Sequence, residues 1–177
     1  MTPRADLGEL VEGTGVAVAV DPDGPLAGVL LRGASGAGKS DLALRLIEQC
    51  PWRRTCLVAD DLVIVGAKGK SLAMRHPGSL AGKMEARGFG IIRVPFTQSS
   101  SLRLVAETGG PASRLPEYRE EQLIASARAM IPVIACAFLE PSAPARVRHA
   151  LRAFLARHFD SQRQDVLSTE AKGQREI

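Results

Sequence analysis

An eight-residue segment, residues 33–40, constrains this chain more than any other part of it. It reads Gly-Ala-Ser-Gly-Ala-Gly-Lys-Ser and fits the pattern Gly-x4-Gly-Lys-Ser/Thr. An apolar run over residues 26–32 leads directly into it, and apolar side chains then recur at helical spacing from Lys39 until Pro51. A strand, a glycine-rich loop and a helix in this order form a phosphate cradle. The segment therefore predicts an α/β fold with a strand before the loop and a helix after it.

The loop offers several groups that bind phosphate. Glycines let the backbone turn with its N–H groups inward, and the start of the helix adds further unpaired N–H groups. Lys39 can reach the β- and γ-phosphate oxygens, and the Ser40 hydroxyl can bind Mg²⁺. The alternative is a plain glycine-rich turn capped by serine. We predict that ATP phosphates bind along Gly33, Ala34, Ser35, Gly36, Ala37, Gly38, Lys39 and Ser40.

Two adjacent carboxylates, Asp60 and Asp61, follow the predicted strand over residues 55–59. Ligands of open α/β sheets bind outside the carboxyl ends of the strands. Beside a magnesium nucleotide, one carboxylate can orient metal-bound water and the other can accept a proton from an attacking hydroxyl. Because side chains alternate along a strand, the two should have different roles. The alternative is an acidic pair that forms a turn.

A third segment, residues 84–94, reads Met-Glu-Ala-Arg-Gly-Phe-Gly-Ile-Ile-Arg-Val. We predict a short helix carrying Glu85 and Arg87, broken by Gly88 and Gly90, and then a strand. Glu85 is a candidate for a second carboxylate at the metal, and Arg87 is a candidate to clamp a phosphate. Read alone, the two residues also fit a surface ion pair at a helix end.

The remaining pattern predicts one domain over residues 1–160 and a polar, non-periodic tail over 161–177. Besides the strands already named, the pattern predicts a strand over 15–20 that forms a hairpin with 26–32. It also predicts strands over 91–94, 102–106 and 131–139, with residues 62–65 extending the 55–59 strand, a loop over 108–118, and helices over 79–86, 119–128 and 144–159.

Composition narrows the class of protein. Apolar residues make up 45% and charged residues 24% of 177, which excludes wholesale disorder. The longest near-apolar run, residues 130–139, is about half of the ~20 residues that a membrane helix needs. Three cysteines in no Cys-x-x-Cys pair, and a start without a signal peptide, favour small buried thiols in the cytoplasm. A net charge of +4 is compatible with nucleic-acid binding. The cations are scattered along the sequence, however, and aromatic residues make up only 4%, so we expect no nucleic-acid partner.

Taken in order, the three segments resemble the HPr kinase/phosphorylase family. Residues 84–94 are similar to that family's signature, Leu-Glu-Ile-Arg-Gly-Leu-Gly-Ile-Ile-Asn-Val. The resemblance covers about residues 10–155 and the catalytic domain only, without the separate N-terminal domain of longer members. It implies a mixed-sheet phosphate-loop fold related to phosphoenolpyruvate carboxykinase, assembled as a hexamer.

The resemblance also implies an activity: ATP- and Mg²⁺-dependent phosphorylation of a serine on HPr, the phosphocarrier of the sugar phosphotransferase system, and the reverse phosphorolysis by inorganic phosphate. It implies that Lys39 binds phosphate and that Ser40 and Glu85 bind Mg²⁺. The aspartate pair would contain the proton acceptor, with Asp61 favoured and Asp60 as the alternative. Residues 113–116 resemble the segment that bears a catalytic arginine, which makes Arg114 a candidate; the alternative is a loop arginine in solvent.

One departure from the family concerns phosphorolysis. Residues 11–17 read Val-Glu-Gly-Thr-Gly-Val-Ala, where the family has a pattern like Val-His-Ala-Thr-x-Val-Ala, so Glu12 replaces a histidine. A carboxylate repels phosphate, and residues 140–146 also lack the Pro-Val-Arg-Pro-Gly-Arg pattern of longer members. We therefore expect inefficient phosphorolysis. A small-molecule kinase and a non-catalytic nucleotide-binding regulator are the alternatives to a kinase of HPr.

Overall fold

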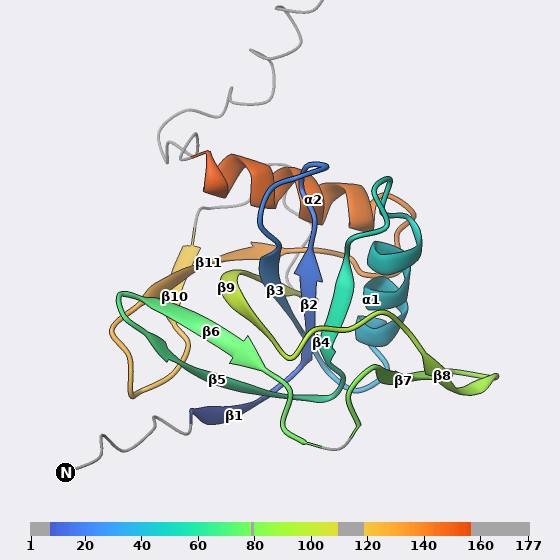
Figure 1. The fold of residues 1–177 in the computed structure, drawn as a ribbon, viewed down its shortest axis with the longest axis horizontal. Coiled ribbons are helices and arrows are strands. Elements are labelled where there is room, and N and C mark those ends of the chain that lie inside the picture. The colour runs from blue at the N-terminus through green and yellow to red at the C-terminus, as the bar shows by residue number, and fades with distance from the viewer. Residues whose placement is uncertain (1–7, 79, 110–118, 157–177) are drawn as a thin grey trace, which may run out of the picture.

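The computed structural model describes residues 8–78, 80–109 and 119–156. A curled mixed sheet of nine strands forms its centre, and the helices α1 (Lys39–Glu48) and α2 (Ala143–Leu155) pack on one side of it (Figure 1). A separate two-stranded sheet lies beside α1. The strands are β1 (Glu9–Glu12), β2 (Thr14–Val18), β3 (Ala27–Arg32), β4 (Cys56–Ala59), β5 (Leu62–Lys68), β6 (Ser71–Arg75), β7 (Lys83–Ala86), β8 (Gly90–Arg93), β9 (Ser99–Glu107), β10 (Arg119–Gln122) and β11 (Met130–Ala135).

The strand order brings distant segments to one edge of the sheet. The order is β1-β5-β6-β9-β3-β2-β4, and β11, followed by β10, pairs with the end of β9. β3 runs parallel to β9, and β2 lies antiparallel between β3 and β4. The carboxyl ends of β3 and β4 and the first residue of β2 therefore meet at the same edge. The loop after β3 and the acid pair after β4 are both at this edge, as the sequence predicted.

The central strands are buried on both faces. Every residue of β2 and β4 is buried, and so are the first five residues of β3. Alternate side chains enter two different clusters: Val16 and Val18 contribute to the cluster under the helices, and Ala17 to the cluster inside the curl of the sheet. Burial on both faces explains why these strands read as nearly continuous apolar runs in the sequence.

Most predicted elements are confirmed. The β2–β3 hairpin, α1, β4, β8, β9, β11 and α2 lie where the pattern placed them, within a few residues at their ends. Within the described part of the chain, no helix is long and apolar enough to cross a membrane. The three cysteines are free and buried. Burial raises the pKa of the Cys50 thiol, but hydrogen bonds from the Thr55 hydroxyl and from nearby backbone groups outweigh it and lower this pKa to about 7. The tail over 161–177 and most of the predicted 108–118 loop lie outside the described residues.

Two predicted helices are wrong. Residues 79–86 contain β7, which pairs with β8 in a hairpin. Burial alternates along this segment as it does in a strand, since Met84 is buried and Glu85 is exposed. The glycine-rich break is the hairpin turn, where Gly88 has φ +81°. Residues 119–128 begin with β10, a charged edge strand, and continue without a helix.

Three smaller differences concern strands. Residues 62–65 do not extend β4 but start β5, because Asp61 adopts φ +65° and turns the chain. The strands β1 and β6 were not predicted at all. Both pair on the outer part of the sheet with β5, whose pattern is only half buried.

An ion-pair network ties the strand before the glycine-rich loop to its neighbours. One Arg32 nitrogen, Nη2, lies 2.7 Å from the Oε2 of Glu107 and 2.9 Å from the Oε2 of Glu121, and Arg119 also contacts Glu107. Burial by itself raises the pKa of Glu107, but the hydrogen bonds from Arg32 and Arg119 outweigh it and hold that pKa below its usual value.

We expect Glu107→Gln to lower the free energy of unfolding by about 1 kcal/mol at pH 7, because it weakens the charge-assisted hydrogen bond between Arg32 and Glu107, whose side chains are less than one third exposed. A depressed carboxyl pKa stabilises the fold above the unfolded pKa, and the stabilisation disappears as the pH falls through the folded pKa. Urea unfolding should therefore show a gap between the unfolding free energies of wild type and variant at pH 7, and this gap should narrow as the pH falls below the ordinary pKa of a glutamate. A gap that persists at low pH would contradict this account.

Candidate active site

The glycine-rich loop connects β3 to α1 and is shaped by its glycines. Gly36 and Gly38 have φ +81° and +91°, which side chains other than glycine rarely adopt. Gly38 is the N-cap of α1 and makes no side-chain capping bond. The amide groups of the first helical turn therefore remain available to an anion.

The first glycine of the loop is required by packing. A Cβ at Gly33 would lie 2.3 Å from Cγ2 of Thr108, whose backbone N–H is bonded to the Arg32 carbonyl. We expect Gly33→Ala to lower the free energy of unfolding by about 2 kcal/mol through this overlap. Adding Thr108→Ser, which removes Cγ2, should restore most of the loss, as measured by urea unfolding. An equal loss in the single and double variants would show that backbone conformation and not the overlap matters.

The lysine of the loop lies over the loop's own backbone. The Nζ of Lys39 donates to the carbonyls of Gly33 and Ala34 at 2.8 and 2.9 Å. These two bonds hold the ammonium group at the mouth of the loop. A positive charge and the free amides of α1 are thus directed at the same small region.

Asp60 is the centre of the site. Its Oδ1 accepts hydrogen bonds from the hydroxyls of Ser40 and Thr14, both at 2.9 Å. Its Oδ2 accepts the backbone N–H of Glu85 at 3.4 Å. One carboxylate therefore joins the loop, the start of β2 and the β7–β8 hairpin. The two oxygens have different surroundings, because among the described residues Oδ2 accepts only the single long hydrogen bond from Glu85.

Asp61 has a different position. Its φ is +65°, its side chain is exposed, and its carbonyl accepts the Gly13 N–H at 2.9 Å. Within the described residues the Asp61 carboxylate makes no hydrogen bond or ion pair. The predicted difference in placement between the two aspartates is therefore present in the structure. Glu12, at the end of β1, pairs in register with Leu62, the residue after Asp61.

The hairpin brings two more predicted side chains close. Glu85 lies on β7, its side chain is exposed, and its backbone N–H donates to Oδ2 of Asp60. Arg87, in the turn, has a guanidinium nitrogen 3.7 Å from the Cβ position of Gly36. Arg114 falls outside the described residues. The structure thus gathers the loop, Asp60, Glu85 and Arg87 at one edge.

Thr14 is a site residue that our sequence analysis did not single out. Its side chain is fully buried, and its hydroxyl donates to Oδ1 of Asp60. The sequence did contain a sign of its importance, because the family pattern compared with residues 11–17 also has a threonine at this position. The pattern does not say what the hydroxyl contacts, and only the strand pairing shows it.

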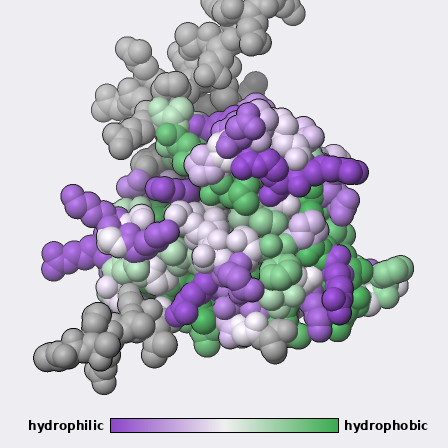
Figure 2. Space-filling model, in the orientation of Figure 1, coloured by the Kyte–Doolittle hydropathy of each residue, from purple (hydrophilic) through white to green (hydrophobic). Residues whose placement is uncertain are grey.

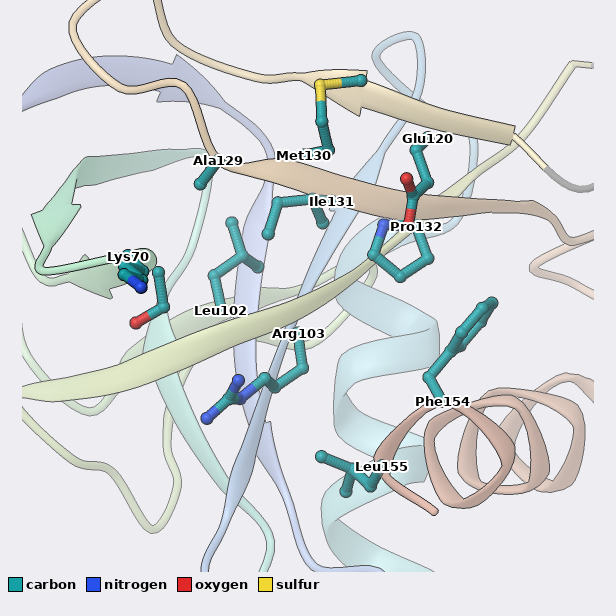
Figure 3. Close-up of a pocket in the computed structure, with 11 residues that line it drawn as sticks. Lys70, Leu102, Arg103, Glu120, Ala129, Met130, Ile131, Pro132, Phe154 and Leu155 are labelled. Carbon is teal, nitrogen blue, oxygen red and sulfur yellow. The ribbon is translucent and has the colours of Figure 1, made fainter. Parts of the chain in front are cut away.

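A separate cavity of about 520 Å³ lies at the opposite end of the sheet (Figure 3). Leu102, in its wall, pairs with Gly28 at the start of β3, whereas the glycine-rich loop follows the end of β3. None of the predicted site residues lines it. Its wall includes Lys70, Leu102, Arg103, Glu120, Ile131 and Phe154.

Comparison with known proteins agrees with this geometry. The family model of the HPr serine kinase C-terminal domain matches residues 11–100, which contain the loop, both aspartates and the hairpin. The chain belongs to the HPr serine kinase C-terminal domain family. The family resemblance read from the three sequence segments is therefore confirmed.

Curated relatives of this family match parts of the chain. An HPr kinase/phosphorylase of Clostridium tetani is 38% identical over 95 residues, which are 54% of this chain and 30% of that protein. One from Aromatoleum aromaticum is 41% identical over 125 residues, which are 61% of this chain and 39% of that protein. The matched residues thus span well under half the length of these relatives.

A solved structure shares the fold of this HPr serine kinase C-terminal domain. The HPr(Ser) kinase/phosphatase from Coxiella burnetii superposes with a TM-score of 0.67 at 23% identity, covering 85% of this chain and 92% of that one. The predicted mixed α/β sheet with flanking helices is confirmed at this level. The predicted relation to phosphoenolpyruvate carboxykinase stays a prediction.

Proposed function

We propose that this chain is an ATP- and Mg²⁺-dependent protein-serine kinase that phosphorylates HPr. The observation that carries the proposal is the contact between Ser40 of the glycine-rich loop and Asp60, which joins a phosphate cradle to a carboxylate. Membership of the HPr serine kinase C-terminal domain family supports the choice of HPr as the acceptor.

The residues present fit a magnesium nucleotide. The amides of residues 33–40 and the Lys39 ammonium would hold the β- and γ-phosphates, and Ser40 and Glu85 would hold Mg²⁺. Within the described residues, no three His, Cys, Asp or Glu side chains cluster as a metal site. This agrees with Mg²⁺, which proteins bind through one or two carboxylates together with substrate phosphates. Bound Mg²⁺ would neutralise charge that develops on the phosphate oxygens.

We assign the proton acceptor to Asp60 and not to Asp61, which the sequence favoured. The Ser40 and Thr14 hydroxyls orient the Asp60 carboxylate through Oδ1, and Oδ2 then faces the hairpin side with one weak contact. An oxygen in that position can take the proton of an attacking serine hydroxyl. No side chain in the described part of the chain forms a hydrogen bond or ion pair with the exposed Asp61 carboxylate.

Other parts of the proposal rest on the family resemblance. Arg114 would stabilise charge on the transferred phosphoryl group, and the enzyme would be a hexamer. Neither a membrane nor nucleic acid is proposed as a partner. Phosphorolysis should be inefficient, because Glu12, which pairs in register with the residue after Asp61, carries a carboxylate that would repel phosphate.

The test mixes the protein with Mg²⁺, labelled ATP and purified HPr, and locates the label. Label on an HPr serine supports the proposal. Label found only on a small metabolite indicates a small-molecule kinase, and tight ATP binding without turnover indicates a regulator; either result overturns the proposal. Incubating phospho-HPr with inorganic phosphate measures the reverse reaction, for which we expect a much lower rate.

A further inference from the structure

The β7–β8 hairpin exposes large apolar side chains to solvent. Phe89 is 84% exposed and Ile91 75% exposed, and Leu80, just before the hairpin, is 61% exposed. In Figure 2, green side chains extend along the projection at the right of the molecule, where Figure 1 places this hairpin. The opposite face of the hairpin, with Met84 and Ile92, packs into the core. The apolar side chains are therefore exposed on one face of a hairpin whose other face is packed against the core. We call Phe89 and Ile91 the hairpin face.

The hairpin face lies beside the candidate active site. Ile91 is the direct cross-strand partner of Glu85, so the two side chains share a face of the hairpin. The backbone of Glu85 contacts Oδ2 of Asp60, the oxygen that we assign to proton acceptance. A protein whose serine reaches Asp60 would therefore come close to this hairpin.

Two cations lie at the end of the hairpin away from its turn. Lys83 and Arg93 are cross-strand partners, and like charges directly opposite each other destabilise a strand pair. Neither forms an ion pair with another described residue. An incoming carboxylate would relieve this repulsion, so the charges favour an acidic partner.

We propose that the hairpin face is the docking surface for the protein substrate, a folded protein that presents apolar side chains ringed by aspartate or glutamate next to its acceptor serine. This inference rests on the proposed function and deepens it. Apolar contact with Phe89 and Ile91 would supply affinity, and Lys83 and Arg93 would orient the partner.

The test uses the double variant Phe89→Ser/Ile91→Thr of the full chain, with Met130→Thr as a matched control. Met130 is a strand residue, 51% exposed, in the wall of the remote cavity. The double variant should raise the KM for HPr by about tenfold or more, the size of effect typical of central contact residues, with kcat and nucleotide affinity unchanged. A second variant, Lys83→Glu/Arg93→Glu, should raise the same KM and remove its dependence on salt.

The outcomes separate the docking surface from the proposed function. If the wild type transfers no phosphate to HPr, the proposed function fails and the docking surface with it. If the wild type transfers phosphate and the double variant keeps the wild-type KM, only the docking surface is overturned. A double variant that changes oligomeric state by light scattering and keeps its KM would assign the hairpin face to a contact between copies of the chain.

Discussion

Asp60→Asn is expected to lower the rate of phosphoryl transfer to HPr by about 10²- to 10⁴-fold, the usual contribution of a positioned proton acceptor. The asparagine keeps one oxygen for the Ser40 and Thr14 hydroxyls, which contact Oδ1 at 2.9 Å in the wild type. It replaces the other oxygen with an amide group, which cannot accept a proton. Single-turnover transfer of label from ATP to HPr measures the loss, and titration of a fluorescent nucleotide should show an affinity close to that of the wild type.

Asp61→Asn is the matched control for this result. It makes the same chemical change one residue away, and asparagine tolerates the positive φ of 65° at this position. We expect a loss of less than about tenfold, because a carboxylate without an orienting partner contributes little to proton transfer. A reversed pattern, with transfer abolished only by Asp61→Asn, would move the proton acceptor to Asp61. A large loss of nucleotide affinity in Asp60→Asn would instead make Asp60 part of the magnesium site.

Lys39→Met is expected to lower transfer by about 10²- to 10³-fold, the typical effect of removing one group that stabilises charge in a transition state. The Nζ of Lys39 is held by the Gly33 and Ala34 carbonyls at the mouth of the loop, where the γ-phosphate would bind. Methionine keeps an unbranched side chain that is one atom shorter, and it removes the charge and the donors. Nucleotide affinity should fall as well, because the ground-state phosphates also contact this group.

Lys70→Met provides the comparison for Lys39→Met, since Lys70 is an exposed lysine in the wall of the remote cavity. It should leave transfer and nucleotide affinity unchanged. Thermal unfolding of Lys39→Met should be close to that of the wild type, because only two partly exposed hydrogen bonds are lost. If Lys39→Met retained more than half of the wild-type rate, the loop would not be the site of the transferred phosphoryl group.

The central elements of the fold could be predicted from the sequence, whereas several of the short peripheral strands could not. The β2–β3 hairpin, β4 and α1 were predicted because each combines a strong apolar pattern with a clear end signal, such as Pro51 after α1. The sequence pattern predicts helices in place of β7 and β10, because each strand is only four residues long and contains at least two charged residues. In such short segments pairing decides the conformation: β7 is held by β8, and β10 by β11.

The sequence by itself determined the family, the glycine-rich pattern of residues 33–40, and the order of the strand and helix on either side of them. These features can be recognised from local spacing, because the glycines, the lysine and the serine of such a loop are close together in the sequence. Only the tertiary structure decided which carboxylate faces Ser40, that Thr14 orients it, and that Glu85 arrives on a strand with an exposed apolar face beside it. The reason is that Asp60 and Asp61 are neighbours with the same chemistry, and the positive φ of Asp61 together with the pairing of β2 with β4 gives their side chains different surroundings.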